Sequence, residues 1–157
     1  METEPRQNAF VKVSGDLYKS ERLIKWLEQL CKKYFVVVCV GGGTQINEAL
    51  EGVGVKQGPH GPLGRELKTF AERQLARNVL ELNQGKLQDI LAAKKIPAVV
   101  EIPVYNIGGV LCHINGDLAI QMAYLGFDAL FAVTKAHRVE KKKEQFAHLP
   151  KIEIIAF

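Results

Sequence analysis

The sequence predicts an α/β domain built on a mainly parallel sheet with helices on both of its sides. The unbroken apolar run "YFVVVCV" (34–40) is typical of a strand that is buried on both faces, and "DALFAVT" (128–134) also reads as a buried strand. Helical patterns lie between the strand-like runs, and such alternation is typical of βαβ units. The chain has 157 residues, of which 47% are hydrophobic, so we expect one domain over 1–157 with a sizeable core.

The first part of the chain reads as two strand–helix units followed by a loop. Ser20 can cap a helix whose apolar residues recur on one face, and Thr44 can cap a second helix. The segment after this second helix is dense in glycine and proline, which indicates a loop. In chain order, the expected elements are a strand at 9–15, a helix at about 21–31, a strand at 34–40, a helix at 44–51 and a loop at 51–64.

The second part of the chain continues the alternation. Asn115 or Asp117 can cap the helix that precedes the strand-like run at 128–134. The expected elements are helices at about 65–82 and 86–95, a strand at 96–104, a turn at 106–109, a helix from about 116 to 125, and strands at 128–134 and 151–157. We therefore expect helices to cover both sides of the sheet.

Composition and charge exclude several classes of protein. The apolar runs are too short to span a bilayer, and the first residues carry no signal-peptide pattern. Three cysteines without CxxC spacing argue against a disulfide framework and a zinc site, so we expect no metal site and a cytoplasmic location. A net charge of only +4 without an aromatic platform does not favour nucleic-acid binding.

Three consecutive glycines, Gly41, Gly42 and Gly43, join the strand at 34–40 to the next helix. In open parallel sheets ligands bind beyond the carboxyl ends of strands, and a helix N-terminus there offers unpaired N–H groups and partial positive charge. Glycine allows the backbone to approach a ligand closely, which favours a phosphate site. The alternative is a tight turn, for which one glycine would normally suffice.

Two further junctions point to the same edge of the sheet. Lys12 precedes Ser14 and Gly15 at the end of the first strand, and its ammonium could neutralise a transferring phosphoryl group. Asp117 lies near a helix start and could orient Lys12 through a charge-assisted hydrogen bond. Taken separately, Lys12 is better explained as an exposed strand residue and Asp117 as a helix cap worth about 1 kcal/mol.

Together, "VKVSGDL", "VVCVGGG" and "INGDLAIQMAYLGFDALFAVTK" resemble, in this order, three landmarks of the amino acid kinase superfamily. The Ser14-Gly15 and Thr134-Lys135 forms are most similar to the uridylate kinase branch, whereas Asn115 with Asp117 is similar to the acetylglutamate kinase branch. The resemblance covers about residues 9 to 140. It implies a three-layer αβα sandwich and phosphoryl transfer from ATP, with Mg²⁺, to a carboxylate, carbamate or phosphate.

The resemblance also implies roles for individual residues. Lys12 would stabilise the transferring group, and Asp117 would organise the lysines, which makes these two the catalytic candidates. The candidates for substrate and phosphate binding are Ser14, Gly15, Gly41, Gly42, Gly43, Arg65 and Asn115. The candidates for nucleotide binding are Thr134, Lys135 and Arg138. Catalysis of this kind depends on positioning and charge rather than on covalent chemistry by the protein.

The chain also departs from the family pattern after Lys135. His137 and Arg138 stand where the family has Asp and Gly, and the family's second catalytic lysine has no counterpart by homology, so we expect a domain shortened on its C-terminal side. Lys141 to Lys143 are expected to be solvated, and they are also the nearby basic group that could replace that lysine. We expect a small-molecule kinase or, alternatively, a non-catalytic phosphate-binding or regulatory subunit, in either case a homo-oligomer.

Overall fold

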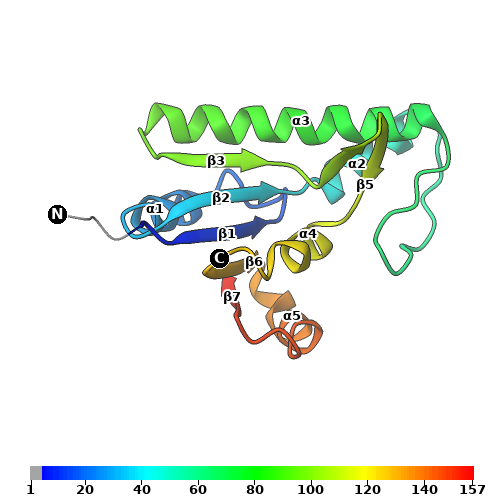
Figure 1. Ribbon diagram of the computed structural model, residues 1–157. Helices are drawn as coiled ribbons and strands as arrows, with labels where there is room; N and C mark the ends of the chain where they lie inside the picture. Colours follow the sequence, from blue (N-terminus) through cyan, green and yellow to red (C-terminus); the bar gives the residue numbers. More distant parts are fainter. Residues whose placement is uncertain (1–4) are drawn as a thin grey trace.

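In the computed structural model, which describes residues 5–157, five parallel strands form a sheet of order β3-β2-β1-β6-β7 (Figure 1). Residues 1–4 of the expected domain lie outside the described part. The strands are β1 (Asn8–Val13), β2 (Phe35–Val40), β3 (Ala98–Glu101), β6 (Ala129–Thr134) and β7 (Ile152–Ala156). Within residues 5–157 there are five α-helices: α1 (Glu21–Leu30), α2 (Gly43–Gly52), α3 (Phe70–Ala93), α4 (Gly116–Ala123) and α5 (Val139–Gln145).

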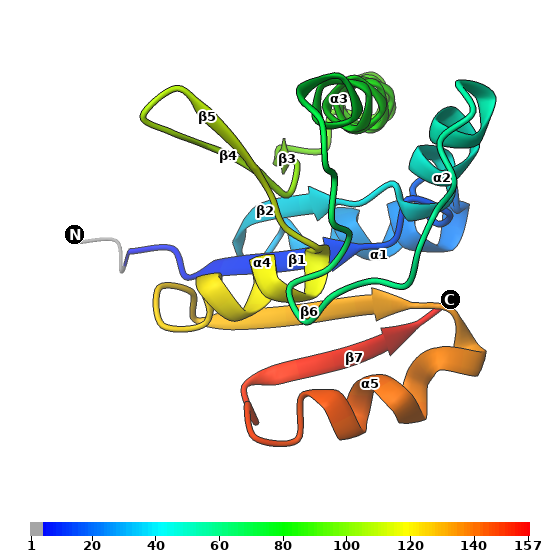
Figure 2. The same ribbon diagram turned by 90° about the vertical axis from the view of Figure 1, so that its right-hand side faces the viewer.

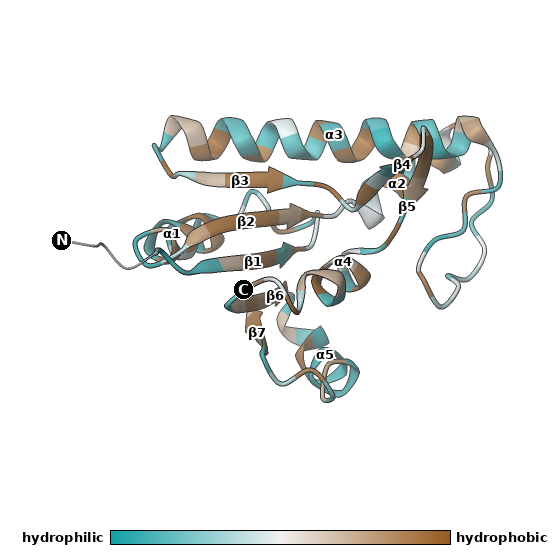
Figure 3. Cartoon of the chain, viewed as in Figure 1, coloured by the Kyte–Doolittle hydropathy of each residue, from teal (hydrophilic) through white to brown (hydrophobic). Residues whose placement is uncertain are grey.

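The α/β class and the parallel sheet are thus confirmed, and the alternation of side chains along β1 explains how helices cover both faces. Ala9, Val11 and Val13 point to the face covered by α1 and α3, while Phe10 points to the face covered by α4 and α5. Figure 2 shows α4 and α1 on opposite sides of the sheet. The core strand β2 is largely hydrophobic along its length (Figure 3), as burial on both faces requires.

Several predicted caps are confirmed and one is wrong. Ser20 caps α1 by accepting from the Leu23 N–H, and Asn115 caps α4 by accepting from the Leu118 N–H at 2.7 Å. Thr44 does not cap α2, because the helix starts at Gly43, with Gly42 as its N-cap and no side-chain hydrogen bond to the helix end. The Thr44 hydroxyl donates instead to Asp16 Oδ2 at 3.2 Å.

The segment between β2 and β3 differs most from expectation. The two helices predicted at 65–82 and 86–95 form one helix, α3, which begins only at Phe70, where Thr69 caps it. Gly85 does not interrupt α3, because the buried leucines on either side of it keep the helix packed. Arg65 therefore lies in an irregular segment rather than at a helix start.

An antiparallel hairpin follows β3, in place of the longer strand predicted at 96–104. It consists of β4 (Val104–Ile107) and β5 (Val110–His113), and its turn contains Gly108 and Gly109, both with positive φ, at the predicted turn. Figure 2 shows the hairpin projecting away from the five-stranded sheet. Within residues 5–157, none of the helices is both long enough and apolar enough to cross a membrane.

Candidate functional site

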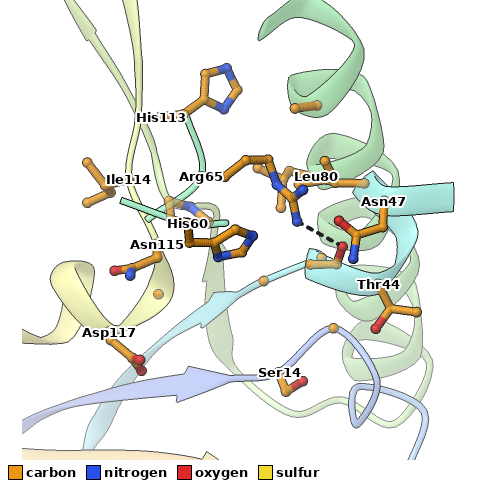
Figure 4. Close-up of a pocket in the computed structure, with 18 of the residues that line it drawn as sticks. Ser14, Thr44, Asn47, His60, Arg65, Leu80, His113, Ile114, Asn115 and Asp117 are labelled. Carbon is orange, nitrogen blue, oxygen red and sulfur yellow. Dashed lines mark hydrogen bonds between the residues drawn. The ribbon is translucent and has the colours of Figure 1, made fainter. Parts of the chain in front are cut away.

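A cleft of about 350 Å³ lies beyond the carboxyl ends of β1 and β2 (Figure 4). The central strand β1 lies beside β2 on one side and β6 on the other, and chain order reverses there, which is the usual ligand-binding position in open α/β sheets. The cleft is lined by the turns after β1 and β2, the start of α4, the 60–67 segment and the base of the hairpin. Its volume suits a small molecule.

Lys12 reaches this cleft from the central strand. Its side chain projects toward the α4 face of the sheet and passes beneath Gly116, the first residue of α4. A Cβ at Gly116 would lie 2.7 Å from Cε of Lys12 and 3.1 Å from Cγ, so any side chain at this position would force Lys12 to move. Lys12 is therefore held by its surroundings and is not the exposed strand residue that was the alternative.

Asp117 binds two lysines at the floor of the cleft. Its Oδ1 lies 3.5 Å from the Lys12 ammonium, which confirms the predicted proximity of these residues. Lys142 of α5 donates to the other carboxylate oxygen, Oδ2, and Gln145 Nε2 donates to the same atom at 3.2 Å. The side chains of Lys12 and Lys142 are each only 13% exposed. The prediction that Lys142 is solvated, which rested on its position in a basic run, is therefore wrong.

Burial and charge shift the pKa values of this cluster. Burial lowers the pKa of Lys12. The Asp117 carboxylate partly offsets this shift, and the nearby Lys142 charge adds to it. Burial alone would raise the pKa of Asp117, but the two lysines and the hydrogen bonds from Lys142 and Gln145 hold it below its usual range. Asp117 is therefore an ionised carboxylate at neutral pH that fixes two cations.

The glycine turns above this cluster are shaped by carboxamide side chains. Asn83 of α3 donates to the Gly41 carbonyl at 3.0 Å, and Gln45 of α2 donates to the Gly15 carbonyl at 3.1 Å. A Cβ at Gly42 would lie 2.9 Å from Asn83 Nδ2, and one at Gly15 would lie 2.6 Å from the Gly41 carbonyl oxygen. Packing within the protein therefore requires glycine at these two positions.

Gly43 differs from its neighbours, because a Cβ there would meet no atom within 4 Å and the residue lines the cleft. It is the first residue of α2, whose N-terminal N–H groups have no side-chain cap. The first hydrogen bond of the helix runs from the Ile46 N–H to the Gly42 carbonyl, so the amides before Ile46 are available to a ligand. Free N–H groups at a helix start suit an anion, and the phosphate site stays a prediction from the sequence.

The opposite side of the cleft combines a cation with an apolar wall. Arg65 donates to the Gly43 carbonyl at 3.2 Å and to Gln57, and Gly64, with φ of +113°, packs its backbone against Asn115 (Figure 4). The apolar lining consists of Ile46, Leu67, Ala76, Leu80, Pro103 and Ile114. Two buried polar atoms there have no partner among the described residues, namely Asn47 Oδ1 and His113 Nε2.

The structure brings ten of the twelve predicted site residues to the cleft and leaves two outside it. Ser14 and the exposed Arg138 line the cleft together with the lysine cluster and the glycine turns. Thr134 is buried at the end of β6, and Lys135 is bound to Asp16 at 3.2 Å, so neither lines the cleft. Both follow β6, which β1 separates from β2, so they lie outside this cleft, and their role at a nucleotide remains a prediction.

Sequence reasoning missed several residues that shape the site. It placed Lys142 in a basic run without selecting it, and it did not consider Gly116, Asn47 or Asn83. The sequence pattern did indicate two of these residues, Asn83 and Gly116. Asn83 interrupts the apolar stripe of Ala76, Leu80, Leu87 and Leu91, and Gly116 is a poor helix former placed inside the first turn.

The cleft offers little for a metal ion. Its two carboxylates are both engaged, Asp117 with lysines and Asp16 with Lys135 and Thr44. No group of three or more His, Cys, Asp or Glu side chains suited to a metal occurs in residues 5–157. Against these two carboxylates stand Lys12, Lys142, Arg65 and Arg138, so the lining carries an excess of positive charge.

Comparison of the chain with protein-family models and with curated proteins found no match.

Proposed function

We propose that the cleft binds a phosphate-bearing small molecule, either a nucleotide or a phosphorylated metabolite. We further propose that the protein is a phosphotransferase with an amino acid kinase-like three-layer αβα fold. The observation that carries this proposal is the pair of largely buried lysines, Lys12 and Lys142, held by one ionised carboxylate in the same cleft as the uncapped start of α2. The ordered motifs around Lys12, Gly41–Gly43 and Asp117 support the family resemblance.

The chemistry follows from this arrangement of cations. In phosphoryl transfer an acceptor oxygen bonds to phosphorus while the bond to the leaving diphosphate breaks, and negative charge spreads over the transferring oxygens. Lys12 and Lys142 would neutralise that charge, and the N–H groups of Gly42 and Gly43 would hold a phosphate oxygen. A carboxylate, carbamate or phosphate acceptor arrives already ionised, so Asp117 need not act as a base.

The proposal includes ATP and Mg²⁺, which the family resemblance implies. The glycine turns and the two lysines fit the phosphates of a nucleotide, since they combine free amides with buried cations. Mg²⁺ would be held mainly by phosphate oxygens, because both carboxylates of the cleft already bind cations or donors. When bound, the ion would offset phosphate charge.

A non-catalytic binding or regulatory subunit is the second candidate, and one observation favours it. Thr134 and Lys135, which the resemblance places at the nucleotide, do not face the cleft. A protein that keeps the anion site without these nucleotide contacts would bind a phosphorylated ligand and transfer nothing. The two candidates share the same cleft and differ in turnover.

The test combines calorimetry with a transfer assay. Titration with ATP, with and without Mg²⁺, and with phosphorylated metabolites measures binding, and radiolabelled ATP with carboxylate and phosphate acceptors measures transfer. We expect binding that Lys12→Met weakens by at least tenfold, while Lys141→Met, which alters an exposed neighbour of Lys142, leaves it unchanged. Binding with transfer supports the kinase, and binding without transfer supports the regulatory subunit. Absence of binding by every phosphate compound would refute both.

Self-association remains part of the proposal. Exposed apolar side chains occur on the hairpin, where Ile107 is 66% and Val110 is 62% exposed, and after α4, where Leu125 is 94% exposed. Such residues commonly become buried in an oligomer. Light scattering coupled to gel filtration should give a mass of at least twice that of the 17.5 kDa chain; a monomer at all concentrations would refute the prediction.

A further inference from the structure

Asn83 is a polar residue in an otherwise apolar helix face. Ala76, Leu80, Leu87 and Leu91 share this buried face of α3 with it, and Asn83 itself is only 2% exposed. A buried amide is costly unless it forms hydrogen bonds, whereas a leucine would continue the apolar packing. The presence of the amide therefore calls for a specific partner, and that partner is the Gly41 carbonyl, 3.0 Å from Asn83 Nδ2.

This hydrogen bond determines which way the glycine turn faces. All peptide bonds among the described residues are trans, so the Gly41 carbonyl and the Gly42 N–H point in opposite directions. Because the carbonyl points to Asn83 Nδ2, the Gly42 N–H points away from that amide, and Gly42 itself lines the cleft. Among residues 5–157 this N–H has no hydrogen-bond acceptor.

We propose that Asn83 is a positioning residue, which holds the Gly41–Gly42 peptide so that its N–H is presented to an anion in the cleft. This inference rests on the proposed function of the cleft as a phosphate site. Asn83 does not line the cleft, so it acts only through the turn. Without its amide the peptide can rotate and present its carbonyl oxygen, which repels a phosphate.

Two substitutions at Asn83 separate orientation from packing. Asn83→Leu removes the donor while keeping an apolar helix face. Asn83→Asp is nearly isosteric, but its ionised carboxylate accepts hydrogen bonds only, so it repels the Gly41 carbonyl and favours the rotated peptide. When the new carboxyl is protonated its O–H can donate to Gly41 again, and burial raises the pKa at which this happens.

The matched control is Gln84→Leu. Gln84 is the next residue of α3, and its Nε2 likewise donates to a backbone carbonyl, that of Val100, at 2.7 Å. Gln84 does not line the cleft, and its bond joins α3 to β3 instead of to the glycine turn. If ATP affinity depends only on general contacts of α3, the variants of Asn83 and of Gln84 should both lose affinity. If it depends on the orientation of the glycine turn, only the Asn83 variants should lose it.

The experiment measures ATP affinity of the full chain by calorimetry at several pH values. We expect Asn83→Leu and Asn83→Asp to weaken ATP binding roughly 10- to 100-fold at pH 8, and Gln84→Leu to change it less than twofold. The affinity of Asn83→Asp relative to the wild type should recover as pH falls toward 5, and that of Asn83→Leu should not. The ratio to wild type removes the titration of ATP itself.

The possible outcomes are distinct. Wild-type binding that Asn83→Leu leaves unchanged, or a loss equal to that of Gln84→Leu, would overturn the positioning role while leaving the proposed function intact. A flat pH profile of the Asn83→Asp ratio would also overturn it. If the wild type binds neither ATP nor inorganic pyrophosphate nor any of the phosphorylated metabolites, the proposed function fails, and the role of Asn83 fails with it.

Discussion

Gly116→Ala offers a way to displace Lys12 without removing it. Gly116 is the first residue of α4, a position where alanine is a better helix former than glycine, so the helix should be retained. The added Cβ would lie 2.7 Å from Cε of Lys12, whereas ordinary contact begins near 3.4 Å. The end of the lysine must therefore move by roughly 0.7 Å, which would disturb its 3.5 Å contact with Asp117.

A misplacement of about 1 Å in a reacting group can cost about 10²-fold in rate. We therefore expect Gly116→Ala to lower phosphoryl transfer, or ATP affinity if the protein only binds, by roughly 10- to 100-fold with a nearly unchanged melting temperature. Gly52→Ala, at the end of α2 where a Cβ meets no atom, is the control. In a double-mutant cycle, Gly116→Ala should add almost nothing to Lys12→Met, because both act on the same ammonium. Additive losses, or wild-type behaviour of Gly116→Ala, would refute the reasoning.

Three further predictions concern other parts of the cleft. Lys142→Met should lower transfer or ATP affinity by about 10²-fold in a calorimetric or radiolabel assay, while Lys141→Met should not; equal effects would contradict a specific role for Lys142. The folded state lowers the pKa of Asp117, so the Asp117 carboxylate stabilises the fold at pH values above its ordinary pKa of about 4. The free energy of unfolding lost in Asp117→Asn, measured by urea titration, should therefore be smaller at pH 3 than at pH 7. A loss that is the same at both pH values would argue against the ion pairs. Gly43→Val should abolish phosphate binding without changing thermal stability relative to Gly52→Val, and a full-affinity Gly43→Val would mean that no ligand approaches this turn.

The strands and most helices were predictable because their signals are local. The run at 34–40 is apolar at every position, so burial on both faces follows directly, and Ser20 and Asn115 cap helices through bonds to residues three positions away. The meeting of Lys12 with Asp117 was predicted from the order of the motifs. It became possible because parallel strands bring their carboxyl ends, and the helix starts beyond them, to one edge of the sheet.

The features that were missed depend on contacts between distant segments. Lys142 belongs to a basic run in which Lys141 and Lys143 have the same local pattern, and only the packing of α5 beside α4 selects it for Asp117. The merging of two expected helices into α3 reflects tertiary packing of leucines around Gly85, which outweighs the weak helix propensity of one glycine. The hairpin after β3 has few buried residues, so the hydrophobic pattern gave little indication of it.

Three consecutive residues at the start of α4 have three different structural roles: a helix cap, a close packing contact and an ion pair. Asn115 accepts the Leu118 N–H and so fixes where the helix begins, and its Cβ is packed against the backbone of Gly64. Gly116 then leaves room for the Lys12 side chain, and the Asp117 carboxylate reaches that lysine from above. A shift of the helix start by one residue would place a side chain on the path of Lys12 and turn Asp117 by about 100° around the helix axis. The cap is therefore a condition for the ion pair. Of the two explanations that the sequence offered for this segment, the helix cap applies to Asn115, and the catalytic carboxylate is proposed for Asp117 of the same turn.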